Sequence, residues 1–208
     1  MSHDAIRSQV GNYYSDKVTA HGPTARGVDW NSPESQQLRF CQLAKVIDSG
    51  ASFSINDYGC GYGAFVEHLE ENELPFTYRG FDISEEMIAE ARKLHPASDR
   101  VAFVTRESEL RPASYTVASG IFNVKLQTGE KEWTQYVLDT LHSLDGLSQK
   151  GFSFNVLTKY SDPEFMRPNL YYADPEFLFN YCKTNFSRFV ALLHDYPLYE
   201  FTILVRKL

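Results

Sequence analysis

The sequence predicts an α/β domain built on a mostly parallel, seven-stranded sheet with helices on both faces. Segments rich in apolar and β-branched residues are typical of strands, at 53–58, 78–82, 101–104, 115–122, 152–157, 188–194 and 200–205. Helical patterns separate most of these segments, and this alternation indicates parallel strands covered on both sides. Five residues join the last two strands, too few for a parallel crossover, so the last strand should run antiparallel.

The helices have recognisable starts and apolar faces. Ser32-Pro33-Glu34 places a capping residue, a first-turn proline and a carboxylate at the start of a helix that ends near Gly50. Further helices are expected at 64–71, 84–94, 130–144 and from Asp174 onward. The first 30 residues mix Tyr, Gly and charged groups without clear periodicity, and they indicate no particular element.

Composition narrows the class of protein. The 208 residues suffice for a single domain spanning 1–208, and no repeat or linker divides them. The formal net charge is −7 and no more than two Lys or Arg residues are adjacent, so we expect no nucleic-acid partner. The cysteines Cys41, Cys60 and Cys182 lack metal-ligand spacing, so we expect no metal site and reduced thiols in the cytoplasm. We see no signal peptide or membrane-spanning run, so no membrane association is expected.

A glycine-rich loop, residues 57–63, follows the first strand and precedes a helix. Glycines let the backbone turn sharply and let a ligand approach where a Cβ would interfere. Asp82 ends the second strand 23 residues after Gly59, the separation at which an acidic residue can receive ribose hydroxyls. Alternatively, Asp82 simply ends a strand before the helix cap at Ser84.

Two cofactors are compatible with this loop. Gly59-x-Gly61-x-x-Ala64 fits a dinucleotide pattern, which leaves an NAD-linked oxidoreductase as an alternative. Asp57 favours S-adenosylmethionine (SAM) instead, because a carboxylate at this position would repel a pyrophosphate. A chain of this length also leaves little room for the separate substrate domain of a typical dehydrogenase.

Two segments resemble motifs of the class I SAM-dependent methyltransferases. Residues 57–63 match D-x-G-C-G-x-G, and residues 80–88 match G-x-D-x-S-x-x-M-I. The resemblance covers roughly residues 50–157. It implies a Rossmann-like methyltransferase sheet, SAM as the cofactor and a methyl group as the group transferred.

The resemblance also implies roles for individual residues. Asp57, Gly59 and Gly61 would hold the methionine moiety, Asp82 would take the ribose hydroxyls, and Ile83 would pack on adenine. Glu107 or Ser108 would meet the adenine amino group. The segment 119–124, which includes Asn123, would line the sulfonium and substrate pocket. The remaining candidates for cofactor contacts are Tyr14, Arg39, Cys60 and Met87.

Methyl transfer to a hydroxyl also requires a proton acceptor, and two histidines are candidates. His194 follows an apolar strand that should deliver it to the carboxyl edge of the sheet, where ligands bind in open α/β folds. An imidazole that titrates near neutrality suits this role. His21 is the second candidate. The structural alternative is a solvent-facing histidine at a strand end.

Two segments outside the motifs are expected to complete the site. Residues 1–31, with Tyr13, Tyr14 and Trp30, are predicted to form a lid over the cofactor, or else simply to pack on the sheet. Residues 158–173 are predicted to be an insertion that binds the acceptor, where Lys159 or Arg167 could meet a phosphate or carboxylate.

The aromatic lid, Gly27-Val28-Asp29-Trp30 and His194-Asp195-Tyr196 together resemble small bacterial methyltransferases of sugar or surface-polysaccharide biosynthesis. This resemblance implies a small-molecule acceptor methylated on oxygen or nitrogen, such as a sugar or surface-polysaccharide precursor. A non-catalytic SAM-binding protein is a further alternative.

Overall fold

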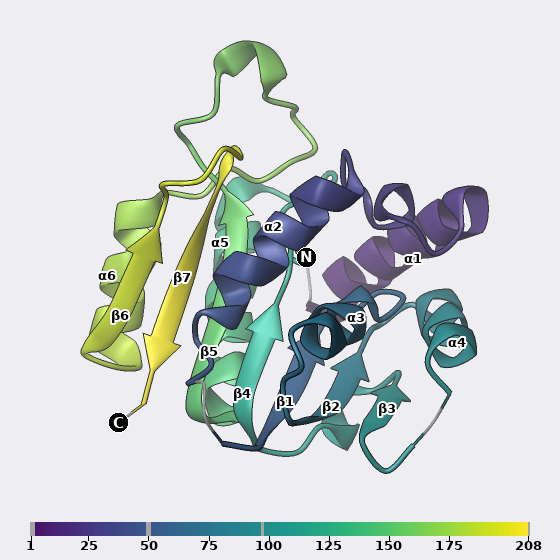
Figure 1. Ribbon diagram of the computed structural model, residues 1–208. Coiled ribbons are helices and arrows are strands. Elements are labelled where there is room, and N and C mark those ends of the chain that lie inside the picture. The colour runs from purple at the N-terminus through teal and green to yellow at the C-terminus, as the bar shows by residue number, and fades with distance from the viewer. Residues whose placement is uncertain (1–2, 49–50, 97, 208) are drawn as a thin grey trace.

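The computed structural model describes residues 3–48, 51–96 and 98–207. A single sheet of seven strands runs through the molecule (Figure 1). The strands are β1 Phe53–Tyr58, β2 Phe76–Phe81, β3 Val101–Val104, β4 Ala113–Ala118, β5 Ser148–Leu157, β6 Phe189–Leu193 and β7 Glu200–Arg206. Their order across the sheet is β3-β2-β1-β4-β5-β7-β6.

The direction of the strands confirms the predicted fold class. β1 to β5 pair in parallel, and β7 pairs antiparallel with both β5 and β6. Asp57 at the end of β1 lies level with Gly80 of β2 and Val117 of β4. The loops that follow these three strands therefore meet at one edge of the sheet.

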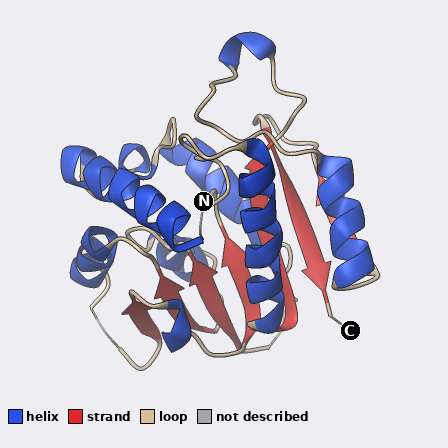
Figure 2. Cartoon of the chain, turned by 180° about the vertical axis from the view of Figure 1, so that it is seen from behind, coloured by secondary structure: helices blue, strands red, loops and turns tan. Residues whose placement is uncertain are grey.

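Helices cover both faces of the sheet. The described part of the chain forms α1 His3–His21, α2 Pro33–Ala44, α3 Ala64–Glu71, α4 Glu85–Leu94, α5 Glu130–Gly146 and α6 Pro175–Asn185. The α2, α3 and α4 side chains join one hydrophobic core with β1, β2 and β3, and those of α5 and α6 join a second core with β5 and β7. Figure 2 shows α5 and α6 on the face opposite to α2 and α3. Helix α1 instead lies at the carboxyl ends of the strands, near α4 (Figure 1).

The predicted helix starts are confirmed by their caps. The Ser32 hydroxyl accepts from the Ser35 amide, and the Ser35 hydroxyl accepts from the Ser32 amide, so the two form a reciprocal capping box. The Ser84 hydroxyl accepts from the Met87 amide at 3.1 Å, and the Asp174 carboxylate caps α6. Each cap satisfies amides that the first turn of a helix leaves without partners.

Four parts of the chain differ from the predicted elements. The helix predicted to end near Gly50, a residue outside the described ones, ends at Ala44. The first 30 residues are largely helical, with α1 followed by a short 3-10 helix, Ala25–Val28. β4 ends at Ala118 because the backbone turns at Gly120, where φ is +71°, although buried Phe122 continues the apolar pattern. β5 begins at Ser148, directly after α5, so that this strand starts four residues earlier than the predicted 152.

Residues 158–173 leave the sheet after β5 and return beside it, as the protruding loop at the top of Figure 1. Bridges between Thr158 and Ala173 and between Val124 and Leu170 fix the base of this loop. Phe165 and Met166 are exposed near its tip. Among the helices of the described residues, none is both long and apolar enough to cross a bilayer.

Candidate active site

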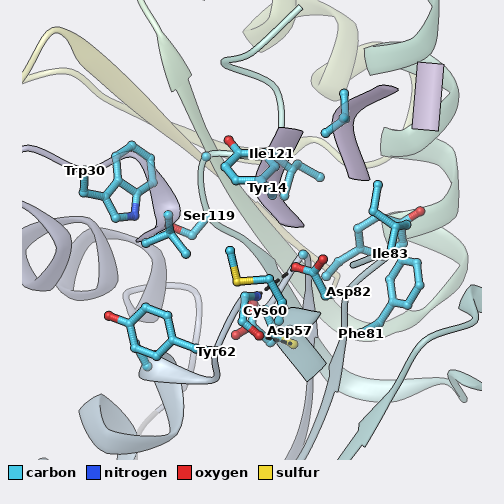
Figure 3. A pocket seen from close by; sticks show the side chains of 18 of the residues that line it. Tyr14, Trp30, Asp57, Cys60, Tyr62, Phe81, Asp82, Ile83, Ser119 and Ile121 are labelled. Atoms are coloured by element: carbon cyan, nitrogen blue, oxygen red, sulfur yellow. Dashed lines mark hydrogen bonds between the residues drawn. The ribbon is translucent and has the colours of Figure 1, made fainter. Parts of the chain in front are cut away.

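A pocket of about 90 Å³ lies at the carboxyl ends of β1, β2 and β4, under α1 (Figure 3). The glycine-rich loop forms its base, and the end of β2 and the turn after β4 form two of its sides. Val10 and Tyr14 of α1 line it as well, together with Val28 and Trp30 from the connection to α2. Segments far apart in the sequence therefore enclose one cavity.

The conformation of the loop explains its glycines. The backbone φ angles of Gly59 and Gly61 are +80° and +54°, values that side chains with a Cβ rarely adopt. A Cβ at Gly59 would lie 2.2 Å from Ile121 Cγ2. The amides of Gly59 and Cys60 both donate to the Phe81 carbonyl, at 2.7 and 2.9 Å, and hold the loop against the end of β2.

Asp82 connects the loop to the next helix. Its Oδ2 accepts from the Gly61 amide and its Oδ1 accepts from the Ser84 amide, both at 2.9 Å. Burial raises the pKa of the Asp82 carboxyl, and these backbone hydrogen bonds act in the opposite direction. The side chain also lines the pocket, so the same carboxylate supports the loop and faces a ligand.

Asp57 is a second buried carboxyl in this pocket. It is 3% exposed, and it accepts a hydrogen bond of 2.8 Å from the Tyr78 hydroxyl. Burial raises the pKa of Asp57 to about 7, against the lowering effect of that bond. No Lys or Arg side chain among the described residues forms an ion pair with Asp57 or Asp82. The pocket therefore favours a ligand that brings a cationic group and hydroxyl donors, and it disfavours a pyrophosphate.

Helix α1 holds its position over the pocket through polar contacts. Arg7 donates to the Tyr58 hydroxyl at 3.0 Å and to Glu107 Oε2 at 2.5 Å. The Ser15 hydroxyl donates to Glu86 Oε2 at 2.6 Å on α4. These contacts join α1 to the end of β1, to the turn after β3 and to α4, which follows β2.

Most of the residues predicted from the two motifs meet in this pocket. The predicted residues among its lining are Tyr14, Asp57, Gly59, Cys60, Gly61, Asp82, Ile83 and Met87. Glu107 lies outside the lining, and Arg7, which does line the pocket, donates to it. Ser108 is exposed, and its carbonyl accepts from Arg111.

A second cavity, of about 590 Å³, lies beside the first. Tyr14, Val28 and Trp30 line both cavities and form a shared wall. The 158–173 loop, up to Phe165 near its tip, and the start of β7 contribute the far side. Its lining combines aromatic rings with side-chain amides, among them Tyr13, Asn31, Asn123, Phe165, Asn169, Tyr172 and Tyr199.

Arg39 and Asn123 belong to this second cavity, not to the first. The Arg39 guanidinium donates to both Glu200 oxygens at 2.8 Å, and its third nitrogen donates to the Ser35 carbonyl. Arg39 was predicted as a cofactor contact, but the structure pairs it with Glu200 outside the first pocket. Asn123 accepts from the Leu157 amide and donates to Glu200.

The two histidines predicted as bases line neither cavity. His194 does follow β6 at the carboxyl edge, but β6 is the outermost strand, with β7 and β5 between it and β4. It is exposed, and its ring lies near Tyr160 and Phe201. His21 is exposed at the end of α1. The sequence indicates which edge a strand end reaches, but not the position of that strand across the sheet.

Several lining residues were not predicted. Val10, Phe81 and Tyr136 reach the first pocket from three different elements, whereas Ser119, Gly120 and Ile121 belong to the segment predicted to line it. Phe81 immediately precedes Asp82, and its place beside the motif could have indicated it. Tyr136 lies on α5 among core residues, where an apolar helix face gives no sign of a pocket.

Comparisons with known proteins agree with this geometry. Residues 55–143 match the family model described as "Methyltransferase domain". The chain is 48% identical over 163 residues to the "Putative methyltransferase Rv1506c" of Mycobacterium tuberculosis (strain ATCC 25618 / H37Rv), a match that covers 78% of this chain and 98% of the relative. The chain belongs to the methyltransferase family. The methyl donor of the family is SAM, and this assignment decides against the NAD-linked oxidoreductase.

Solved methyltransferases share the fold of this methyltransferase along nearly its whole length. The magnesium protoporphyrin IX methyltransferase of Synechocystis PCC 6803, with bound S-adenosylhomocysteine (SAH), has a TM-score of 0.67 at 15% identity over 99% of this chain and 100% of its own. The DhpI–SAH complex has a TM-score of 0.69 at 14% identity, over 99% and 98%. The N-methyltransferase NodS of Bradyrhizobium japonicum WM9, with bound SAH, has a TM-score of 0.65 at 12% identity, over 95% of this chain and 98% of its own. They confirm the Rossmann-like class I sheet.

Proposed function

We propose that this methyltransferase binds SAM in the first pocket and methylates a small hydroxylated or amino compound, such as a sugar, in the second cavity. The observation that carries the proposal is the shared wall of Tyr14, Val28 and Trp30. A ligand in the first pocket and a ligand in the second cavity would contact each other at this wall. Methyl transfer needs such a meeting of two ligands.

The first pocket fits the chemistry of SAM. The buried carboxyl of Asp57 can receive the methionine ammonium group, and Asp82 can receive the ribose hydroxyls. A Cβ at Gly61 would lie 3.0 Å from Val28, so the glycine leaves space that a side chain would fill. Ile83 offers an apolar surface for adenine. Glu107 remains the proposed partner of the adenine amino group. Its carboxylate would then accept from both the adenine amino group and Arg7.

The second cavity suits a compact polar acceptor. The rings of Tyr13, Phe165 and Tyr172 can pack on the C–H faces of a sugar, while Asn31 and Asn169 can pair with its hydroxyls. Arg167 also lines this cavity, and it could meet a phosphate or carboxylate on the acceptor. One neighbour is named for a magnesium protoporphyrin acceptor and NodS is named for N-methylation, so the shared fold does not specify the acceptor.

SAM, when bound, supplies a methyl group already activated by the sulfonium. The protein's part is to align the acceptor atom with the methyl carbon and the sulfur, and to take the proton that the acceptor releases. Of the carboxylates that line the second cavity, Glu200 is buried, with a side chain 1% exposed, in a two-point pair with Arg39, and Glu164 lies on the protruding loop, whereas the Asp29 side chain is 33% exposed. Asp29 lies between Val28 and Trp30 of the shared wall, where Tyr13 and Lys17 hold it at 2.6 and 2.7 Å. We therefore assign the proton acceptor to Asp29 and not to His194 or His21.

Calorimetric titration with SAM, SAH and NAD tests the cofactor pocket. SAM and SAH should bind and NAD should not, and tight binding of NAD alone would overturn the assignment. Transfer is then measured with SAM labelled in its methyl group, against methyl glycosides of glucose, mannose, rhamnose and fucose and against primary amines. Label should pass to a glycoside or amine. Binding of SAH without transfer to any of them would favour a non-catalytic SAM-binding protein.

A further inference from the structure

Trp30 stands at the wall between the two cavities, and its ring packs directly on the turn after β4. A Cβ at Gly120 would lie 2.2 Å from Trp30 Cη2, so the indole occupies the space that the glycine leaves free. The Trp30 amide donates to the Ala25 carbonyl at 2.8 Å, which fixes its backbone. Figure 3 shows the ring beside Ser119, at the rim of the first pocket.

The other contact of this ring is a buried arginine. The Arg39 guanidinium carbon lies 3.8 Å from the centre of the Trp30 ring, at stacking distance. Arg39 is 6% exposed and is held by both oxygens of Glu200, which is 1% exposed. A two-point pair between planar groups fixes orientation as well as distance.

Asn155 of β5 connects these contacts into a closed network. Its Nδ2 donates to Glu200 Oε2 at 2.6 Å, and its Oδ1 accepts from the Gly120 amide at 2.7 Å. Starting from Trp30, one passes to Gly120, Asn155, Glu200 and Arg39, and then returns to the indole. We call these five residues the Trp30 network.

We propose that Trp30 is a positioning residue of the methyl-transfer site, fixed by the buried Arg39–Glu200–Asn155 network. The inference rests on the proposed function, because it takes the second cavity as the acceptor site. A rigid indole at the shared wall limits how the acceptor atom can approach the methyl carbon and keeps water from passing between the cavities. Such buried ion pairs commonly contribute geometry more than net stability.

The two tryptophans of the chain, Trp30 and Trp133, make a direct test possible. Trp133 is fully buried, and its indole donates to the Phe122 carbonyl, so it reports the intact core. With 5-fluorotryptophan at both positions, ¹⁹F NMR should give two resonances, and Trp30→Phe identifies one of them. SAH should move the Trp30 resonance by more than its linewidth and leave the Trp133 resonance in place.

Two variants then test the network. Glu200→Gln removes the charge that holds Arg39, and Arg39→Lys keeps a charge for Glu200 but loses the planar group that stacks on the indole. Both should broaden or shift the Trp30 resonance and increase its H₂O-to-D₂O isotope shift, with SAH affinity nearly unchanged. Glu85→Gln, on the first turn of α4 and outside both cavities and the Trp30 network, is the control and should match the wild type.

The outcomes separate the inference from the proposed function. If calorimetry shows SAH bound while the Trp30 resonance stays in place, or if both variants reproduce the wild-type spectrum, the inference is wrong. Should Glu200→Gln fail to fold, both resonances would collapse, and Arg39→Lys would then decide. With any acceptor that is methylated, the variants should lower kcat more than they raise KM. A screen that yields no acceptor counts against the proposed function alone.

Discussion

At the scale of single residues, Asp57 is where solvent pH should act on cofactor binding. Burial raises its pKa to about 7 in the free protein, and the methionine ammonium group would bind the ionised form. As pH falls through that value the carboxyl takes up a proton, so SAM affinity should fall with it. From a pKa near 7, affinity should rise about eightfold between pH 6 and 7.5. Calorimetric titration across this range measures the slope.

The variant Asp57→Asn provides the control for this dependence. Because an amide cannot ionise, the SAM affinity of this variant should be low and nearly constant over the same range of pH. A wild-type affinity that does not vary from pH 6 to 7.5 would show that the ammonium group binds elsewhere.

Asp82 carries two functions that one substitution should disturb together. Asp82→Asn retains the shape of the side chain but loses a charged acceptor for the ribose hydroxyls and for one of the two amides it holds. SAM affinity should drop about 10- to 100-fold, roughly 1.5–3 kcal/mol. Glu85→Gln, on the first turn of α4 and outside the first pocket, should leave affinity unchanged. Equal affinities for both variants would remove Asp82 from the cofactor site.

The residues that could be predicted are those whose backbone geometry the sequence itself reveals. Glycines and carboxylates that occur together at a strand end are typical of a ligand-binding loop, so Asp57, Gly61 and Asp82 could be identified together. His194 and Arg39 were not, because their surroundings depend on strands far away in the sequence. Arg39 meets Glu200 across 161 positions, and no local pattern indicates such a pair.

At the scale of elements, α1 and the connection after it are proposed to close over the cofactor. Ile6 and Val10 of α1 belong to the hydrophobic core, so deleting the segment would disturb the fold as well as the site. Limited trypsin digestion is therefore the better test. SAH should protect the exposed bond after Arg26, because Val28 and Trp30 line the cofactor pocket. The bond after Lys159, in the protruding loop, should be cut at the same rate with and without SAH.

The weak periodicity of α1 explains why its helix was not foreseen. Its buried residues include Ile6, Val10 and Val18, but its remaining surface is used for specific contacts by Arg7, Tyr13, Tyr14 and Ser15. A helix that lies over the end of a sheet buries less apolar surface than one that packs along it. Helices α3 and α4, which pack along the sheet, were predicted to within a residue or two at their ends.

At the scale of the whole molecule, the contact between β5 and β7 joins the end of the chain to the parallel sheet. A Cβ at Gly151 would lie 2.3 Å from the Val205 carbonyl oxygen, so the two backbones approach more closely there than a side chain allows. Gly151→Ala should lower the free energy of unfolding by roughly 1–3 kcal/mol. Urea unfolding monitored by circular dichroism measures this change.

Gly146 is the matched control for that substitution. It is the last residue of α5, and a Cβ there would meet nothing within 4 Å. Gly146→Ala should leave stability unchanged or raise it by up to about 1 kcal/mol, because alanine restricts the unfolded chain. If the two variants lose equal stability, the close approach at Gly151 is not the cause.

The reversed direction of β7 has a consequence for the order in which the enzyme assembles. Its first residue, Glu200, reaches the edge where β1, β2 and β4 end, so the network around Trp30 closes only after the last strand has docked. The glycine loop and Asp82 need only neighbouring stretches of chain, and contacts between near neighbours form early. In refolding followed by pulse-labelled hydrogen exchange, amides of β1 and β2 should gain protection before those of β7. The glycine loop and Asp82 would then be folded, for a short time, in a protein whose second cavity is not yet closed by β7.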